Sequence, residues 1–337
     1  IIEGKEGVVL GGQPYGGIWN HTWLDRQVKL IGRVPVGDEI YEVEFDALIP
    51  ERAIHSCHKD VDAMKVPDAF KHELFKAVMG YDSKQAFVAE LRELGLSEND
   101  LQVGSWYFVP RTGPLLLAEK KIVSYGHDDR GPTFCGVTAG LASSIDTRTF
   151  PAIVYGCNRE EIGSTGGDGA LSPFIDMAVD TLLKLEGVPE RDISAALQRR
   201  VYWNSVMFSG DVDIAITTSD EPYQDENYGA HMNRGVVVVK SNGSATQSMG
   251  HRASDMMARF TTDLLNDAGV MYQMAELPSK PQQGGGGTIA RHFGERGIDT
   301  IDIGPPVGNM HGQEPYLHIG DLAMAEEADA ALINRKK

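Results

Sequence analysis

The sequence predicts an α/β protein in which a β-rich unit precedes a layered α/β unit. Two observations support this fold class. Before Ser124, strand-like stretches outnumber helical ones, whereas after Ser124 apolar runs alternate with amphipathic helical segments. Alternation of strands and helices along a chain is typical of a layered domain whose sheet is covered by helices.

The first unit is expected to span residues 15–123. Strands are predicted at 27–34, 39–48, 101–110 and 115–123, and helices at 69–79 and 83–94. A turn at 35–38, rich in proline and glycine, joins the first two strands into a hairpin. Ser83 is expected to cap the second helix, because its hydroxyl can accept a hydrogen bond from a backbone N–H of the first turn. Residues 1–14 are interpreted as the tail of a separate element.

The second unit, 124–337, contains the alternating elements. Helices are predicted at 134–144, 172–185, 254–268, 288–296 and 321–334, and strands at 150–155, 212–217, 235–239, 270–274 and 300–303. Ser172 and Pro173 are typical of a helix start, and Gly187 is typical of a helix end.

The composition describes a globular chain with an acidic surface. Of the 337 residues, 31 are Lys or Arg and 48 are Asp or Glu, which gives a formal net charge of −17. This balance argues against nucleic acid or an anionic membrane as the main partner, and part of the acidic excess fits metal ligands. The apolar runs are shorter than the ~18 residues of a membrane span. Three cysteines without CxxC spacing indicate a reducing, cytoplasmic location.

Glu160 and Glu161 are the most informative pair in the chain. They follow the apolar run 150–155, which is predicted to be a buried strand, and they lead into a glycine-rich turn. Two carboxylates at the end of a buried strand are costly, because each charge loses water. A cation at this place explains the pair, with one carboxylate binding it and the other transferring a proton.

Three further polar groups occupy similar places, at 125–130, 209–213 and 309–312. In open α/β sheets such strand ends converge, and carboxylates together with imidazole are the ligand set of zinc and similar ions. A lone strand-end aspartate is more often part of a solvated turn. Asp129 and Asp213 are therefore interpreted as supporting or helix-capping residues, and His127 as either a ligand or a polar neighbour.

Five strings in order carry a resemblance to a known family: YGHDDR, NREEIGSTG, SGDVDIA, QQGGGGTIA and IDIGPPVGNMH. With PYGGIWNHTWLDR and KLIGRV in the first unit, the chain resembles the aspartyl aminopeptidase/vacuolar aminopeptidase I family of dinuclear zinc peptidases. The resemblance implies a three-layer zinc-peptidase catalytic domain, 124–337, with an inserted β-rich interface domain, 15–123. Residues 1–14 would then be a remnant of an N-terminal catalytic segment.

The resemblance also implies roles for individual residues. Asp128 would bridge two zinc ions, for which cobalt or manganese could substitute. Glu161 and His311 would complete one metal site and Asp211 would serve the other, while Glu160 would be the general base. Gly285 and Gly286, in a glycine run that opens a helix, are expected beside the substrate, where their N–H groups could hold a carboxylate or an oxyanion.

Two departures from the family pattern stand out. The second metal site of the family takes a histidine from a His-x-Asp-Ser-Pro block before the YGG segment, and no such block occurs here. We expect it to lie upstream in the native chain. Glu51 stands where the family usually has a histidine that reaches a neighbouring subunit's active site. His55 is a candidate replacement, although an ordinary histidine near a helix start is the simpler interpretation.

The sequence therefore predicts a metallo-aminopeptidase that removes N-terminal residues from peptides and assembles, by resemblance, into a homo-oligomer, a tetrahedral dodecamer. The alternative is a catalytically silent cage or scaffold protein, which the missing histidine and Glu51 favour. A carboxypeptidase or deacylase on a related metal fold is disfavoured by the family-specific strings.

Overall fold

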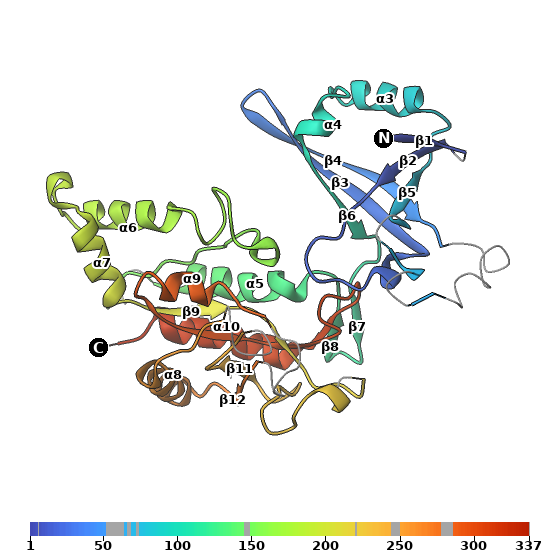
Figure 1. Cartoon of the computed structure of the whole chain (residues 1–337). Coiled ribbons are helices and arrows are strands. Elements are labelled where there is room, and N and C mark those ends of the chain that lie inside the picture. Colours follow the sequence, from blue (N-terminus) through green and yellow to red (C-terminus); the bar gives the residue numbers. More distant parts are fainter. Residues whose placement is uncertain are drawn as a thin grey trace. The chain divides into compact units, whose positions relative to one another are not determined.

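The structure is a computed structural model, and it describes residues 1–5, 7–51, 64–65, 69–71, 74–144, 149–219, 221–243, 250–277 and 286–336. The chain divides into two compact units (Figure 1). The first comprises Ile1–Gly113 with His311–Gln313, and the second comprises Pro114–Met310 with Glu314–Lys337. The interface and catalytic roles expected for 15–123 and 124–337 stay predictions.

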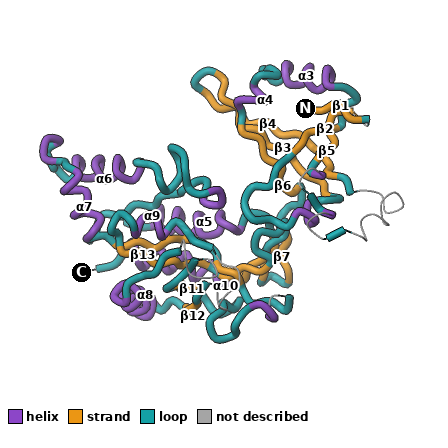
Figure 2. The backbone as a smooth tube through the Cα atoms, in the orientation of Figure 1, coloured by secondary structure: helices purple, strands orange, loops and turns teal. Residues whose placement is uncertain are grey.

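The first unit is built on a six-stranded antiparallel sheet, with strand order β1-β2-β5-β4-β3-β6. Its strands are β1 (Ile2–Gly4), β2 (Gly7–Gly11), β3 (Arg26–Val36), β4 (Glu39–Ile49), β5 (Lys76–Met79) and β6 (Ser105–Pro110), and its helices are α3 (Lys84–Glu93) and α4 (Asp100–Val103). Figure 2 shows the strands of this unit in orange beside the purple α3.

The hairpin of β3 and β4 confirms the predicted pair of strands. Val36 pairs with Glu39, and Gly37 between them adopts a positive φ of 61°, which glycine tolerates without steric cost. Alternate residues of β3 face the core, where Leu30 and Val34 pack against Phe87 of α3. The predicted cap is also present, because the Ser83 hydroxyl accepts a hydrogen bond from the Ala86 N–H at 3.2 Å.

The helix predicted at 69–79 is wrong in its second half. Residues Lys76–Met79 form β5, which pairs with β2 on one side and β4 on the other. Ala77 and Met79 are buried while Lys76 is exposed, so burial follows the period of two that a strand requires. A short apolar run fits both the helical period and the strand period, and here the pairing with neighbouring strands favours the strand.

The second unit contains two sheets. One has the strand order β12-β11-β13-β9 and the other β10-β14-β15-β8-β7. The strands are β7 (Leu115–Leu117), β8 (Lys121–Val123), β9 (Val206–Gly210), β10 (Asp213–Ile214), β11 (Val236–Val239), β12 (Tyr272–Ala275), β13 (Asp299–Gly304), β14 (Pro306–Gly308) and β15 (Tyr316–His318). The helices are α5 (His127–Ala142), α6 (Phe174–Leu185), α7 (Ala195–Trp203), α8 (Asp255–Ala268), α9 (Ala290–Gly294) and α10 (Ile319–Ile333).

Strand β11 shows why this unit is layered. All four of its valines are buried, as expected for a strand covered on both faces. Val236 and Val238 pack with Met257 of α8 and with alanines of α10, whereas Val237 and Val239 pack with Ala230 and Ala275. Both faces of the sheet are therefore covered.

Two differences from the predicted elements concern the neighbourhood of Glu160. The predicted strand at 150–155 is wrong, because the backbone from Pro151 to Cys157 belongs to no ladder and Ile153 and Val154 remain 43% and 45% exposed. The first bridge forms only at Asn158, which pairs with Gly169. The second difference is β9, which the sequence reading missed and which occupies the sheet edge beside β13 instead.

Among the described helices, none combines the length and the apolar composition that crossing a membrane requires.

Candidate metal centre

A tight, left-handed turn presents Glu160 and Glu161. Arg159 has φ 64°, the two glutamates open a short 3-10 helix (Glu160–Ile162), and Gly163 follows with φ 101°. Ser164 is also left-handed, with φ 58°. A non-glycine residue in this region costs on the order of 1 kcal/mol, and such conformations concentrate at functional sites.

The base of this loop is held closed by contacts between its two ends. The Asn158 N–H donates to the Asp168 carbonyl at 2.9 Å, and the Asn158 side-chain amide donates to the Asp168 carboxylate at 2.8 Å. Gly169 passes so close to the other side of the loop that a Cβ there would lie 2.2 Å from the Ser164 carbonyl oxygen. Only glycine fits at this crossing.

Three aspartates of the second unit come together at the start of α5 and the end of β9. One carboxylate oxygen from each of Asp128, Asp129 and Asp211 lies within 4.8 Å of the other two. Asp128 and Asp129 depart from helical backbone angles in the first turn of α5, and Asp211 directly follows β9. Asp129, predicted to be a supporting or helix-capping residue, lies in the group itself. The doublet Asp128-Asp129 was the only signal that could have indicated this.

The electrostatics of the group favour the binding of a cation. Burial, followed by the charges of Asp128 and Glu160, raises the pKa of Asp129 well above its ordinary value. The pKa of Asp211 is raised in the same way, first by burial and then by the charges of Asp129, Asp128 and Glu160. Carboxylates so close together repel one another, and a divalent cation is the usual compensation.

The donor set fits such a cation. Asp129 Oδ1 is buried and has no hydrogen-bond partner in the described part of the chain. A buried carboxylate oxygen without a partner is costly, and metal coordination would satisfy it. His127 lies outside this group. Its Nε2 lies 3.0 Å from the Ile122 carbonyl oxygen, and burial lowers the pKa of its ring. Of the two interpretations of His127, the structure favours the polar neighbour.

The other predicted site residues are placed as follows. By its contacts, His311 belongs to the first unit, and its Nδ1 lies 2.7 Å from the Gly17 carbonyl oxygen. Gly286 is exposed, close before α9. Gly285 and His55 lie outside the described residues. The roles of all these residues stay predictions.

A buried polar network lies close to the end of the glycine run. The Thr288 hydroxyl donates to Asp302 of β13 at 2.6 Å, and the Asn242 amide donates to the other oxygen of the same carboxylate. Asp302 and Asn242 are buried. This network fixes the backbone that follows Gly286, and the sequence reading did not anticipate it.

An α/β fold with carboxylates clustered at the start of α5 and the end of β9 defines a candidate metal-dependent hydrolase. Residues 112–328 match the family described as aminopeptidase I zinc metalloprotease (M18). The chain therefore belongs to this M18 family of zinc metalloproteases.

Curated relatives and solved structures agree with this family. The chain is 28% identical to a probable M18 family aminopeptidase 1 of Thermotoga maritima, over 92% of this chain and 71% of the relative. It is 25% identical to a probable M18 family aminopeptidase 2 of Mycobacterium bovis, over 99% of this chain and 77% of the relative.

Among solved structures, the crystal structure of the M18 aminopeptidase from Thermotoga maritima superposes with a TM-score of 0.84 at 27% identity, covering 98% of this chain and 76% of that one. The aminopeptidase I of Clostridium acetobutylicum gives 0.85 at 21% identity, over 98% and 75%, and supports the fold alone. The predicted α/β fold class is confirmed.

Proposed function

We propose that this chain is a metal-dependent aminopeptidase that removes residues from the N-termini of peptides. The observation that carries the proposal is the carboxylate group of Asp128, Asp129 and Asp211 in a chain of the M18 zinc metalloprotease family. Zinc is the metal that the family description supports. Cobalt and manganese accept the same ligands and remain alternatives.

Two ions are proposed, with Asp128 shared between them. By the family resemblance, Glu161 and His311 would complete one ligand set with Asp128. Asp211 serves the second ion, and the buried oxygen of Asp129 lies in the same group. Shared carboxylates of this kind are typical of two-metal aminopeptidases.

Glu160 is proposed as the general base. When bound, zinc would polarise the scissile carbonyl and lower the pKa of the attacking water. Glu160 would accept a proton from that water and pass it to the leaving amine, which requires a carboxylate held at a fixed place beside the ligands. Its charge already raises the pKa values of Asp129 and Asp211, which supports this proximity. Gly285, Gly286 and His55 are proposed to contact the substrate.

A homo-oligomer is proposed as the working form, and a tetrahedral dodecamer as its finer description. Support comes from the solved dodecamer of mApe1 from S. cerevisiae, which has a similar fold at 17% identity. We also propose a cytoplasmic location, on the ground of the sparse cysteines.

A catalytically silent cage is the second candidate. Glu51, in place of the histidine expected by resemblance, is the observation that favours it. The family membership and the preserved carboxylate group favour the enzyme.

The substitution Glu160→Gln tests the proposal. This variant should bind as much zinc as the parent chain and keep the same oligomeric state, yet lose at least about a thousandfold in kcat, because an amide cannot accept the proton. Release of amino acids from short peptides measures kcat, and elemental analysis measures zinc. Turnover at the parental rate in Glu160→Gln would contradict the role of Glu160, and a parent chain without zinc or turnover would favour the silent cage.

A further inference from the structure

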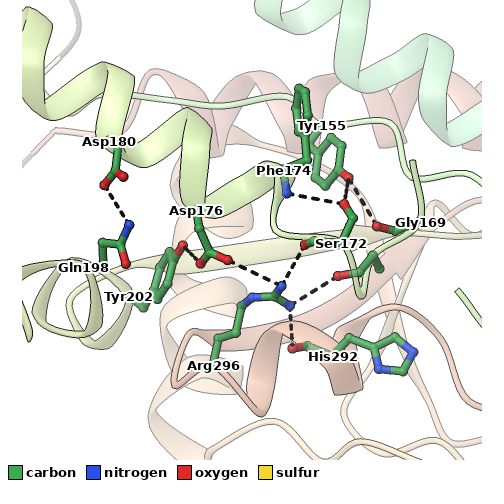
Figure 3. Close-up of polar contacts among 11 residues, drawn as sticks. Tyr155, Gly169, Ser172, Phe174, Asp176, Asp180, Gln198, Tyr202, His292 and Arg296 are labelled. Atoms are coloured by element: carbon green, nitrogen blue, oxygen red, sulfur yellow. Dashed lines mark hydrogen bonds and ion pairs between the residues drawn. The ribbon is translucent and has the colours of Figure 1, made fainter. Parts of the chain in front are cut away.

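Arg296 contacts the segment that follows the loop carrying Glu160 and Glu161, and Figure 3 shows its guanidinium directed toward Ser172. It follows α9, and its side chain is only 19% exposed. The guanidinium donates from Nη2 to the Ser172 carbonyl oxygen at 2.9 Å and from Nη1 to the Ala170 carbonyl oxygen at 3.2 Å. One arginine therefore holds two carbonyls of the backbone that leaves the glutamate loop.

Arginine is suited to this task for a geometric reason. Its planar fork carries several N–H groups in fixed directions, so two acceptors two residues apart can be satisfied at once. A lysine ammonium is a single point on a flexible stem and cannot fix both carbonyls in one arrangement. The ring of Phe293 lies 5.8 Å from the guanidinium and limits its movement further.

The guanidinium is also stabilised by residues of α6 and α7. Asp176 of α6 places Oδ2 3.9 Å from Nη2 of Arg296, and its Oδ1 accepts the hydroxyl of Tyr202 of α7 at 2.5 Å. Tyr202 is buried, and burial together with this hydrogen bond raises the pKa of its phenol, which keeps it a donor. Figure 3 shows these groups in a line that ends at Ser172.

The segment that enters the loop also contacts this network. The Tyr155 hydroxyl lies 3.4 Å from both the Ser172 hydroxyl and the Gly169 carbonyl oxygen. Its ring stacks on Phe174 with centroids 5.0 Å apart. Tyr155 precedes the glutamates and Ser172 follows them, so both ends of the loop are tied to one polar network.

We propose that Arg296 is a positioning residue for Glu160 and Glu161, acting through the backbone of residues 170–172. This inference rests on the proposed function, because that function assigns the roles of general base and metal ligand to the two glutamates. Arg296 fixes the exit of the loop, the network of Tyr155 and Ser172 fixes its entry, and the left-handed turn between them then has one orientation.

The test compares Arg296→Lys and Arg296→Met with the parent chain, in the zinc-loaded full chain. Misplacing a catalytic group by about 1 Å costs up to a hundredfold in rate. We expect kcat to fall about tenfold in the lysine variant and about a hundredfold in the methionine variant, with KM within twofold and the zinc content unchanged. Hydrogen exchange should accelerate at residues 158–172 and remain unchanged in β11 and β13.

Arg259→Met is the matched control. Arg259 forms an exposed pair with Asp263 one turn along α8, and the same loss of charge there should leave kcat unchanged. Tyr202→Phe removes only the hydroxyl behind Asp176, and we expect a severalfold fall in kcat with the same local exchange pattern. If Arg296→Met does not fold, Tyr202→Phe and Arg296→Lys still test whether Arg296 positions the glutamate loop.

The proposal would be overturned by a kcat within twofold of the parent in Arg296→Met, or by a lost kcat with unchanged exchange at 158–172. A parent chain that hydrolyses no peptide would refute the proposed function instead. In that case, the exchange measurement alone still tests whether Arg296 fixes the loop.

Discussion

Arg159 and Asp168 form an ion pair across the base of the glutamate loop, with Nε 2.9 Å from Oδ1. The Asn158 amide adds a second bond to the same carboxylate, and this hydrogen bond is the main reason why the pKa of Asp168 lies below its ordinary value. The residues that precede and follow the catalytic candidates are thus joined directly.

This ion pair predicts a salt-dependent effect on rate. The two side chains are about half exposed, at 47% and 50%, so the pair is weak and screened by salt. Asp168→Asn should lower kcat by roughly two- to fivefold at low ionic strength, since exposed ion pairs contribute little. In about 1 M salt the parent chain should approach the variant. A difference in kcat that salt does not change would contradict the role of the charge.

The cluster of three aspartates predicts that one substitution has opposite effects on thermal stability in the absence and in the presence of zinc. Asp211→Asn removes one of the mutually repelling charges, so the metal-free variant should melt at a higher temperature than the metal-free parent. The same change removes a ligand, so the rise in melting temperature on zinc addition should be smaller than in the parent. Thermal melts with chelator and with excess zinc measure both.

Asp263→Asn is a suitable comparison for this pair of melts, because Asp263 of α8 pairs with Arg259 outside the group. It should leave the zinc-induced rise in melting temperature unchanged. A metal-free Asp211→Asn that melts below the parent, with the zinc shift intact, would contradict the assignment of Asp211.

Asp329 of α10 predicts a pH-dependent stability. Burial, with a contribution from Glu326, raises the pKa of Asp329 from its ordinary value to about 7. The native protein therefore holds this proton more tightly than the unfolded chain between about pH 4 and pH 7, and the free energy of unfolding falls as pH rises through this window. Asp329→Asn should be more stable than the parent above pH 7, by up to about 4 kcal/mol.

The measurement is urea unfolding of metal-free parent and variant at pH 4.5 and pH 8. The variant's advantage should be large at pH 8 and small at pH 4.5. An advantage of equal size at both values would show that the charge of Asp329 is not its cause.

Asp321, at the start of α10, predicts a large structural cost. It is fully buried, and its two carboxylate oxygens accept the N–H groups of Asn233 at 2.6 Å and Gly235 at 2.7 Å. Asp321→Ala leaves both donors without this partner and should lower the free energy of unfolding by about 2–4 kcal/mol. Asp321→Asn keeps one acceptor and should cost less. Equal stability of the alanine variant and the parent would contradict this account.

Elements with strong local signals could be predicted from the sequence. Ser254 caps α8 through the Met257 N–H at 2.9 Å, and Gly269 ends that helix with φ 71°. Both are local effects of side-chain chemistry, as is the hairpin turn at Gly37. The failures at 69–79 and 150–155 concern short apolar runs, whose state depends on partner strands that the local sequence does not specify.

Part of the candidate site could be predicted from unusual residue chemistry. Glu160 and Glu161 stand out as adjacent charges after an apolar run, whereas the role of Asp128 came from the family resemblance, and the roles of all three stay predictions. Asp129 looked like a supporting residue, because its neighbour Asp211 is distant in sequence and only the fold brings the two together. Arg296 gave no signal, since its partners are backbone carbonyls, which every residue has.

We propose that the clustered carboxylates hold zinc and that Glu160 acts with this metal in peptide hydrolysis. The most direct measurement is hydrolysis of a peptide by the purified chain before chelation, after chelation and after zinc is restored, alongside Glu160→Gln carried through the same steps. The account predicts that chelation abolishes release of the N-terminal residue, that zinc restores it, and that Glu160→Gln binds zinc without turnover. Hydrolysis that survives chelation, or that persists in the zinc-loaded variant, would contradict it.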